Sequence, residues 1–289
     1  MFVSDNSVKS VKKYFNERLN STFSDREIRW MFQLIAQKRL GFSSADLILA
    51  DSEKMSESDL LFFRSIVKRL LNQEPFQYIY GETEFYGLMI KTDHRALIPR
   101  PETEELVDWI VKSNDHSNNQ IVDICSGSGC IALALKNEIK SAKVLGLEIS
   151  EKAIELSTEN AQLNNIDVSF LQNDILNDEF PYQDNSIDVI VSNPPYVLEN
   201  EKIGMQGHVL EFEPHLALFV EDKTPLLFYE KITQIAKDKL LNDGYIYFEI
   251  NEKYGHEMIQ LLKEYDFVNI ELKQDLQGKD RMIRGQKKV

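Results

Sequence analysis

The chain has 289 residues, of which 43% are hydrophobic, so it can bury a sizeable core in one or two domains. It contains no run of about 20 apolar residues and no N-terminal cationic segment followed by an apolar one, so we expect a cytoplasmic protein with no signal peptide and no membrane partner. The net charge of −14 is divided into +2 for residues 1–75 and −16 for the remainder, which argues against direct binding of nucleic acid.

Residues 1–75 predict a small all-α domain. Apolar residues such as Val8, Val11 and Phe15 recur at helical spacing. Ser24 and Glu27 have the form of a capping box that begins a second helix. No residue type in this segment indicates chemistry, so we expect a helical bundle that serves as a substrate-docking domain.

Residues 76–98 predict a β-hairpin linker. Tyr78–Gly81 and Glu84–Leu88 are aromatic runs that glycines interrupt, a pattern typical of hairpins. Pro101 then suits the first turn of a helix over residues 102–112.

From residue 120 onward, short apolar runs alternate with helical segments. This alternation predicts an α/β fold with a parallel sheet that helices cover on both faces. The expected strands are 121–125, 144–147, 168–171, 187–191, 245–250, 268–272 and 281–284, and the expected helices between them are 130–139, 151–164 and 226–241.

The strand over 121–125 leads into a glycine-rich loop. Gly127 and Gly129 allow the backbone to approach a ligand closely, and the following helix offers free N–H groups. With Asp123 on the strand and Glu148 about twenty residues further on, the pattern fits the adenosine cofactor of a class I methyltransferase. It also fits the dinucleotide of a nicotinamide-dependent oxidoreductase, which remains an alternative.

Carboxylates end the next two predicted strands. Glu148 is placed to accept both ribose hydroxyls of an adenosine cofactor. Asp174 and Ile175 lie where the adenine ring is expected in such a fold. A solvated strand-end charge and a simple turn residue are the alternative interpretations of Glu148 and Asp174.

The most informative motif is Asn193-Pro194-Pro195-Tyr196, directly after the strand over 187–191. Two prolines end the strand and make the loop rigid at the carboxyl edge of the sheet, where ligands bind in α/β folds. The Asn193 side-chain oxygen and the Pro194 carbonyl oxygen can each accept one hydrogen from a target NH₂, and Tyr196 can stack on a planar target. The motif therefore predicts methyl transfer to an sp² nitrogen, catalysed mainly by positioning and electrostatics.

Over nearly its whole length, the chain resembles the glutamine methyltransferases of peptide chain release factors (the HemK type). The blocks that carry the resemblance, besides the glycine loop and Asn193–Tyr196, are Gln77–Gly81, Glu84–Gly87, Leu97–Glu104, Phe212–Pro214 and Asp275–Arg281. The resemblance implies a class I methyltransferase fold with a Rossmann-like seven-stranded sheet. It also implies three parts: a helical domain over 1–75, a hairpin linker over 76–98 and a methyltransferase domain over 99–289.

The resemblance further implies S-adenosyl-L-methionine as cofactor and S-adenosyl-L-homocysteine as product. The implied target is the side-chain amide nitrogen (N5) of the glutamine in the Gly-Gly-Gln loop of release factors. Cys125 stands where glycine is commoner in the family, and Glu148 where aspartate is commoner. The cofactor residues that we expect are Asp123, Cys125, Ser126, Gly127, Ser128, Gly129, Glu148, Asp174, Ile175 and Asn193, and the expected substrate residues are Asn193, Pro194, Pro195, Tyr196 and Arg100.

Other functions remain open at this level. A ribosomal-protein glutamine methyltransferase would carry the same chemistry, and the acidity of the chain disfavours a DNA amino-methyltransferase. A non-catalytic adaptor would need no intact Asn193 or Glu148. We expect no metal site, because the two cysteines, Cys125 and Cys130, have no neighbouring histidines in the sequence.

Overall fold

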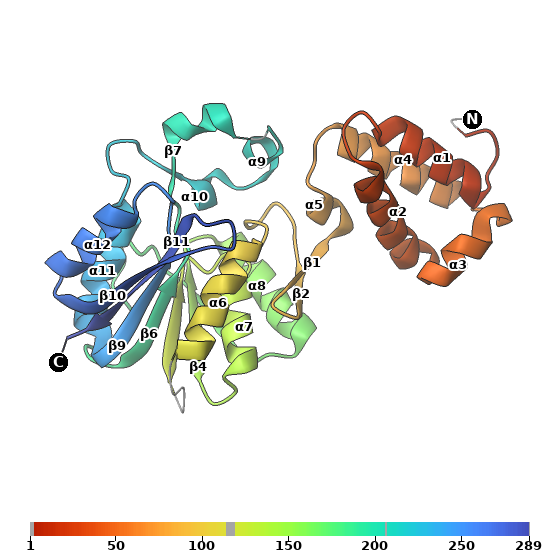
Figure 1. Ribbon diagram of the computed structural model, residues 1–289. Coiled ribbons are helices and arrows are strands. Elements are labelled where there is room, and N and C mark those ends of the chain that lie inside the picture. Colours follow the sequence, from red (N-terminus) through yellow and green to blue (C-terminus); the bar gives the residue numbers. More distant parts are fainter. Residues whose placement is uncertain (1–2, 114–118, 206, 289) are drawn as a thin grey trace. The chain divides into compact units, whose positions relative to one another are not determined.

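The computed structural model describes residues 3–113, 119–205 and 207–288 (Figure 1). Contacts within the chain divide it into two compact units. The first unit is Met1–Gly81 together with Gly207–Phe212, and the second is Glu82–Gln206 together with Glu213–Val289. By its contacts, the hairpin belongs to the second unit.

The first unit is helical, as expected. The predicted capping box is confirmed, since the backbone N–H of Glu27 donates to Ser24 Oγ and that of Ser24 donates to the Glu27 carboxylate. Phe15, Phe32 and Phe63 form the centre of the core. The helices are α1 (Val8–Leu19), α2 (Asp25–Leu40), α3 (Ser44–Leu49), a 3₁₀ turn (Ala50–Ser52), α4 (Glu57–Leu71), α5 (Phe76–Tyr80) and, from the later segment, α9 (Gly207–Phe212).

Residues 76–80 form a helix, so the hairpin prediction was wrong for Tyr78–Gly81. The segment starts after Pro75, and the rings of Phe76 and Tyr80 stack one helical turn apart with centroids 5.6 Å apart. Gly81 ends the helix in the left-handed conformation at φ +87°. Aromatic residues favour strands in general, but local capping and stacking decide the conformation here.

The hairpin itself is present and shorter than predicted. Strands β1 (Glu82–Phe85) and β2 (Leu88–Lys91) pair antiparallel through a turn at Tyr86 and Gly87, which both have positive φ. The side-chain amide of Asn160 makes two hydrogen bonds with the backbone of Lys91 and so holds β2 against the helix that contains Asn160.

The second unit contains the seven-stranded sheet that the resemblance implied. The strand order is β10-β11-β9-β6-β3-β4-β5. The strands from β9 to β5 in this order pair parallel, as their alternation with helices predicted, and β11 pairs antiparallel with both of its neighbours. The strands are β3 (Gln120–Ile124), β4 (Lys143–Glu148), β5 (Ser169–Gln172), β6 (Ile187–Ser192), β9 (Leu240–Glu249), β10 (Phe267–Gln274) and β11 (Asp280–Lys287).

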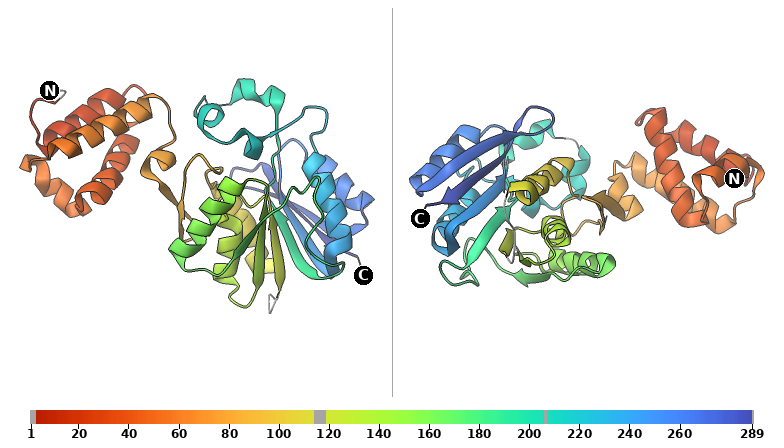
Figure 2. Two further views of the ribbon diagram at one scale, coloured as in Figure 1. Left: turned by 180° about the vertical axis from the view of Figure 1, so that it is seen from behind. Right: turned by 60° about the horizontal axis from the view of Figure 1, so that its bottom comes forward.

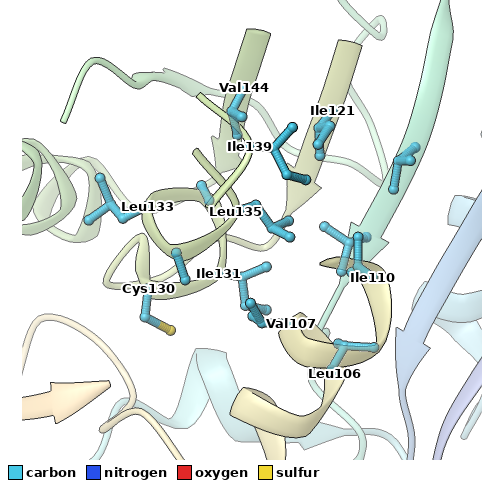
Figure 3. Close-up of a cluster of buried hydrophobic side chains, with 14 of the residues drawn as sticks. Leu106, Val107, Ile110, Ile121, Cys130, Ile131, Leu133, Leu135, Ile139 and Val144 are labelled. Atoms are coloured by element: carbon cyan, nitrogen blue, oxygen red, sulfur yellow. The ribbon is translucent and has the colours of Figure 1, made fainter. Parts of the chain in front are cut away.

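Helices cover both faces of the sheet (Figure 2). One face carries α6 (Pro101–Ser113), α7 (Cys130–Glu138) and α8 (Glu151–Asn164), and Figure 3 shows side chains of α6 and α7 packed together over this face. The other face carries α11 (Leu227–Lys239) and α12 (Gly255–Glu264), of which the sequence patterns had not indicated α12. Along β3, Ile121 belongs to the first core and Val122 to the second, as side-chain alternation requires.

The segment between β6 and α11 forms small elements beyond the carboxyl edge of the sheet. Those that belong to the second unit are β7 (Val197–Leu198), a 3₁₀ helix (Glu199–Gly204), α10 (His215–Leu218) and β8 (Phe219–Val220), and β7 pairs with β8. Within the described ranges, no helix combines the length and the apolar character needed to cross a membrane.

Candidate active site

A cavity lies at the carboxyl edge of the sheet, where β3, β4, β5 and β6 end. Strand order reverses at β3, and such a switch point is where α/β folds place their ligands. The predicted residues that line the cavity are Arg100, Cys125, Ser126, Gly127, Ser128, Glu148, Asp174, Ile175, Asn193 and Pro195. Asp123, Gly129, Pro194 and Tyr196 are not among the residues that line it.

The glycine loop has three left-handed residues: Cys125 at φ +61°, Gly127 at +53° and Gly129 at +80°. A Cβ atom on Gly127 would meet no other atom within 4 Å, so this residue leaves open space at the cavity. A Cβ on Gly129 would lie 2.7 Å from Phe170 Cζ. Gly127 therefore keeps the loop accessible to a ligand, and Gly129 allows the loop to pack on the sheet.

Asp123 supports the loop from below. Its Oδ2 accepts the backbone N–H of Ala132 at 3.2 Å, and its Oδ1 has no hydrogen-bond partner among the described residues. The side chain is fully buried, and burial raises the pKa of Asp123 well above its usual range. In this position Asp123 fastens the first turn of α7 to β3.

Glu148 ends β4 and faces the cavity. Its Oε2 accepts the backbone N–H of Gly127 at 2.9 Å, and its Oε1 accepts that of Ser150 at 3.0 Å. Each carboxylate oxygen retains a second acceptor position. The geometry therefore leaves Glu148 able to accept two hydroxyl hydrogens, as a ribose diol would require.

Further polar atoms around the cavity fit an adenosine cofactor. Ser126 Oγ and Asn173 Oδ1 are buried without hydrogen-bond partners among the described residues, and both residues line the cavity. Such unpaired buried atoms are costly unless a ligand or water satisfies them. Ile175 and Leu176 supply an apolar wall, while Asp174 caps its own turn by accepting the backbone N–H of Leu176 at 3.0 Å.

Asn193 lies at the end of β6 and is held from behind. Its side-chain Nδ2 donates to Thr103 Oγ1 at 3.3 Å, and the Thr103 hydroxyl donates to Glu249 Oε2 at 2.6 Å. The Tyr196 hydroxyl donates to the other carboxylate oxygen, Oε1, at 3.0 Å. Burial, together with the Glu249 charge, raises the pKa of Tyr196. In this arrangement the Tyr196 ring is anchored beside the cavity, and its stacking on a target stays a prediction.

Arg100 is paired at the rim of the cavity. It contacts Glu213 at 2.5 Å, and the same carboxylate accepts the backbone N–H of Ile98 at 3.2 Å. Glu213 is buried. The pair joins the segment before α6 to the segment before α10.

Sequence reasoning missed Thr103, Glu213 and Glu249 as parts of the site. Thr103 and Glu213 lie in two of the blocks that carry the family resemblance, which was an available signal. Glu249 ends an apolar strand in the same way as Glu148, and this pattern also could have identified it. Among the described residues, no cluster of histidine, cysteine, aspartate and glutamate has the geometry of a metal site.

Two family models match the chain. The Methyltransferase small domain matches residues 103–210, and the PrmC N-terminal domain matches residues 13–81. The first match includes the glycine loop, Glu148 and Asn193–Tyr196, whereas Arg100 on the cavity lining lies outside it.

Curated relatives match over nearly the full chain. A release factor glutamine methyltransferase of Flavobacterium psychrophilum is 44% identical over 281 residues, which cover 96% of this chain and 98% of the relative. A protein of the same name from Bacteroides thetaiotaomicron is 37% identical and covers 94% and 98%. A methyltransferase structure from Pyrococcus furiosus aligns with a TM-score of 0.53 at 17% identity, over 78% of this chain and 97% of that one, and supports the fold alone.

Proposed function

Because the chain belongs to the release factor glutamine methyltransferases, we propose that it methylates the side-chain amide nitrogen (N5) of the glutamine in the Gly-Gly-Gln loop of peptide chain release factors. It is an S-adenosylmethionine-dependent enzyme. The observation that carries the proposal is that Asn193, the glycine loop and Glu148 line one cavity.

The residues of this cavity form two groups, one for the cofactor and one for the target nitrogen. Glu148 and the loop around Gly127 hold the cofactor at the ends of β3 and β4, with Asp174 and Ile175 beside the expected adenine. When bound, S-adenosyl-L-methionine supplies an electrophilic methyl group on a sulfonium. The acidic Glu148 also suits a cofactor that carries positive charge.

Asn193 and Pro194 position the target nitrogen. An amide nitrogen is a weak nucleophile because its lone pair is delocalised into the carbonyl group. Asn193 Oδ1 and the Pro194 carbonyl oxygen each accept one of its hydrogens, which fixes the nitrogen and favours a localised lone pair. Positioning of this kind can supply roughly 7–11 kcal/mol of barrier reduction.

We propose that the first unit docks the protein substrate. It carries exposed large apolar side chains, among them Trp30, Ile48 and Leu49, and a net charge opposite in sign to that of the rest of the chain. A contiguous exposed apolar patch marks an interaction surface, and Ile48 and Leu49 are neighbours at the end of α3. We propose that the reaction takes place in the cytoplasm, because release factors act there in translation.

A labelled-methyl transfer assay tests the proposal. The full chain is incubated with labelled S-adenosyl-L-methionine and a release factor, and a release factor whose loop glutamine is replaced by alanine serves as control. We expect label on the first substrate and none on the second. Label on neither substrate, or equal label on both, would contradict the proposed target.

A further inference from the structure

A short row of buried polar groups runs from Asn193 into the protein. Asn193 Nδ2 lies 3.3 Å from Thr103 Oγ1, and Thr103 Oγ1 lies 2.6 Å from Glu249 Oε2. Thr103 is 3% exposed and Glu249 is 2% exposed, so the row is buried, and it meets the cavity at Thr103 and Asn193. The three residues come from α6, the end of β6 and the end of β9.

The hydrogens in this row have one consistent arrangement. The Thr103 hydroxyl donates its single hydrogen to Glu249 Oε2, and Tyr196 donates to the other oxygen of the same carboxylate. The Thr103 oxygen then has only lone pairs left for Asn193. The group of Asn193 that faces Thr103 must therefore be its NH₂, and the carbonyl oxygen Oδ1 occupies the other end of the planar amide.

We infer that Thr103 and Glu249 are positioning residues that hold the Asn193 amide in the orientation that presents Oδ1 to the target nitrogen. The inference rests on the proposed function, in which Oδ1 accepts a hydrogen from the substrate amide. With the amide reversed, an NH₂ group would face the NH₂ of the target, and donor would meet donor. The row thus selects the orientation in which Oδ1 can hold the reacting nitrogen in place for methyl transfer.

The surroundings keep Glu249 in place as the acceptor at the end of the row. Tyr196 donates to Oε1 at 3.0 Å, and the hydroxyl of Tyr229 donates to the main-chain oxygen of Glu249 at 3.1 Å. Burial raises the pKa of Glu249, whereas the hydrogen bonds from Thr103 and Tyr196 and the charge of Arg281 act in the opposite direction. Both carboxylate oxygens have hydroxyl donors, so the side chain cannot rotate without losing one of them.

Substitutions at Thr103 test the inference in the full-length enzyme. Thr103→Val removes the hydroxyl and keeps the shape, and Thr103→Ser keeps the hydroxyl. We expect Thr103→Val to lower kcat for release-factor methylation about tenfold to a hundredfold, the usual effect of removing a partner that orients a functional group. Its KM and the Kd for S-adenosyl-L-methionine should stay within about twofold of the unsubstituted values, and Thr103→Ser should recover most of the loss.

Thr233→Val is the matched control. It makes the same exchange at a buried threonine of α11 whose hydroxyl has no hydrogen-bond partner among the described residues, so kcat should persist even if the melting temperature changes. Wild-type kcat in Thr103→Val, or an equal loss in Thr103→Ser, would overturn the inference. If Thr103→Val does not fold, Thr103→Ala removes the same hydroxyl without adding a methyl group, and its kcat tests the inference in the same way. Absence of transfer by the unsubstituted protein would instead overturn the proposed function, and this inference with it.

Discussion

The carboxylate of Glu148 accepts the backbone N–H of Gly127 at 2.9 Å, and this hydrogen bond joins the end of β4 to the glycine loop after β3. The same side chain lines the cavity. One residue therefore shapes the loop and supplies a negative charge for the ligand that the loop faces.

Glu148→Gln should weaken the binding of S-adenosyl-L-methionine about tenfold to a hundredfold. Hydrogen bonds to a charged group contribute about 1.5–3 kcal/mol, and the substitution removes the charge while keeping the shape. Isothermal titration calorimetry measures the effect. Glu151→Gln, an exposed acid in the first turn of α8, is the control and should keep the original affinity. Equal affinities for all three proteins would show that Glu148 does not contact the ligand.

Cys125→Gly should leave the protein more stable than Cys125→Ala by about 1 kcal/mol. The backbone at this position has φ +61°, where a side chain costs about 1–2 kcal/mol that glycine avoids. Urea unfolding measures the difference. At Cys130, the first residue of α7, the order should reverse because glycine destabilises a helix relative to alanine. The same order at both positions would contradict the strain at Cys125.

Asp123→Asn should remove a pH dependence of stability. The folded-state pKa of Asp123 is raised, first by burial and then by the charge of Glu148, so the folded protein holds this proton more tightly than the unfolded chain does. Its contribution to stability is present at low pH and is lost as pH rises above the usual value of 3.8.

The measurement for Asp123 is urea unfolding without cofactor, between about pH 5 and about pH 8. The variant should gain stability relative to the unsubstituted protein as pH rises. A difference that does not change with pH would indicate that Asp123 ionises normally in the folded protein.

Leu49→Ser should raise KM for a release factor about fivefold, the equivalent of roughly 1 kcal/mol of binding energy. Leu49 is 82% exposed at the end of α3, in the unit proposed to dock the substrate. Steady-state kinetics with the intact release factor and with a short Gly-Gly-Gln peptide separate docking from chemistry, because only the intact substrate should show the change. Leu241→Ser, at the start of β9 in the other unit, is the control. An unchanged KM for the intact substrate would place the docking surface elsewhere.

Local sequence patterns predicted most of the helices and strands, and they failed where capping or contacts with distant residues determine the conformation. The period of Val8, Val11 and Phe15 predicted the first helix, because a helix that buries one face must repeat in this way. Phe76–Tyr80 is a helix within the predicted hairpin linker, because Gly81 caps a short helix whose aromatic residues would by themselves favour a strand.

In the candidate site, too, local motifs were predictable and contacts between distant residues were not. Asn193 and Glu148 follow strands in recognisable motifs, so their meeting at one edge of the sheet was foreseeable. The contact of Thr103 with Glu249 joins residues 146 positions apart, and no spacing rule reports it. The need for glycine at 129 likewise depends on Phe170, which a later strand brings against the loop.

Tandem mass spectrometry of a release factor methylated by the full chain tests the central claim most directly. After incubation with S-adenosyl-L-methionine, we expect the Gly-Gly-Gln peptide to gain the mass of one methyl group, with the fragment ions placing it on the glutamine side-chain nitrogen. Asn193→Ala should give no gain while it still binds the cofactor. An unmodified peptide with the unsubstituted protein, or full methylation by Asn193→Ala, would contradict the account.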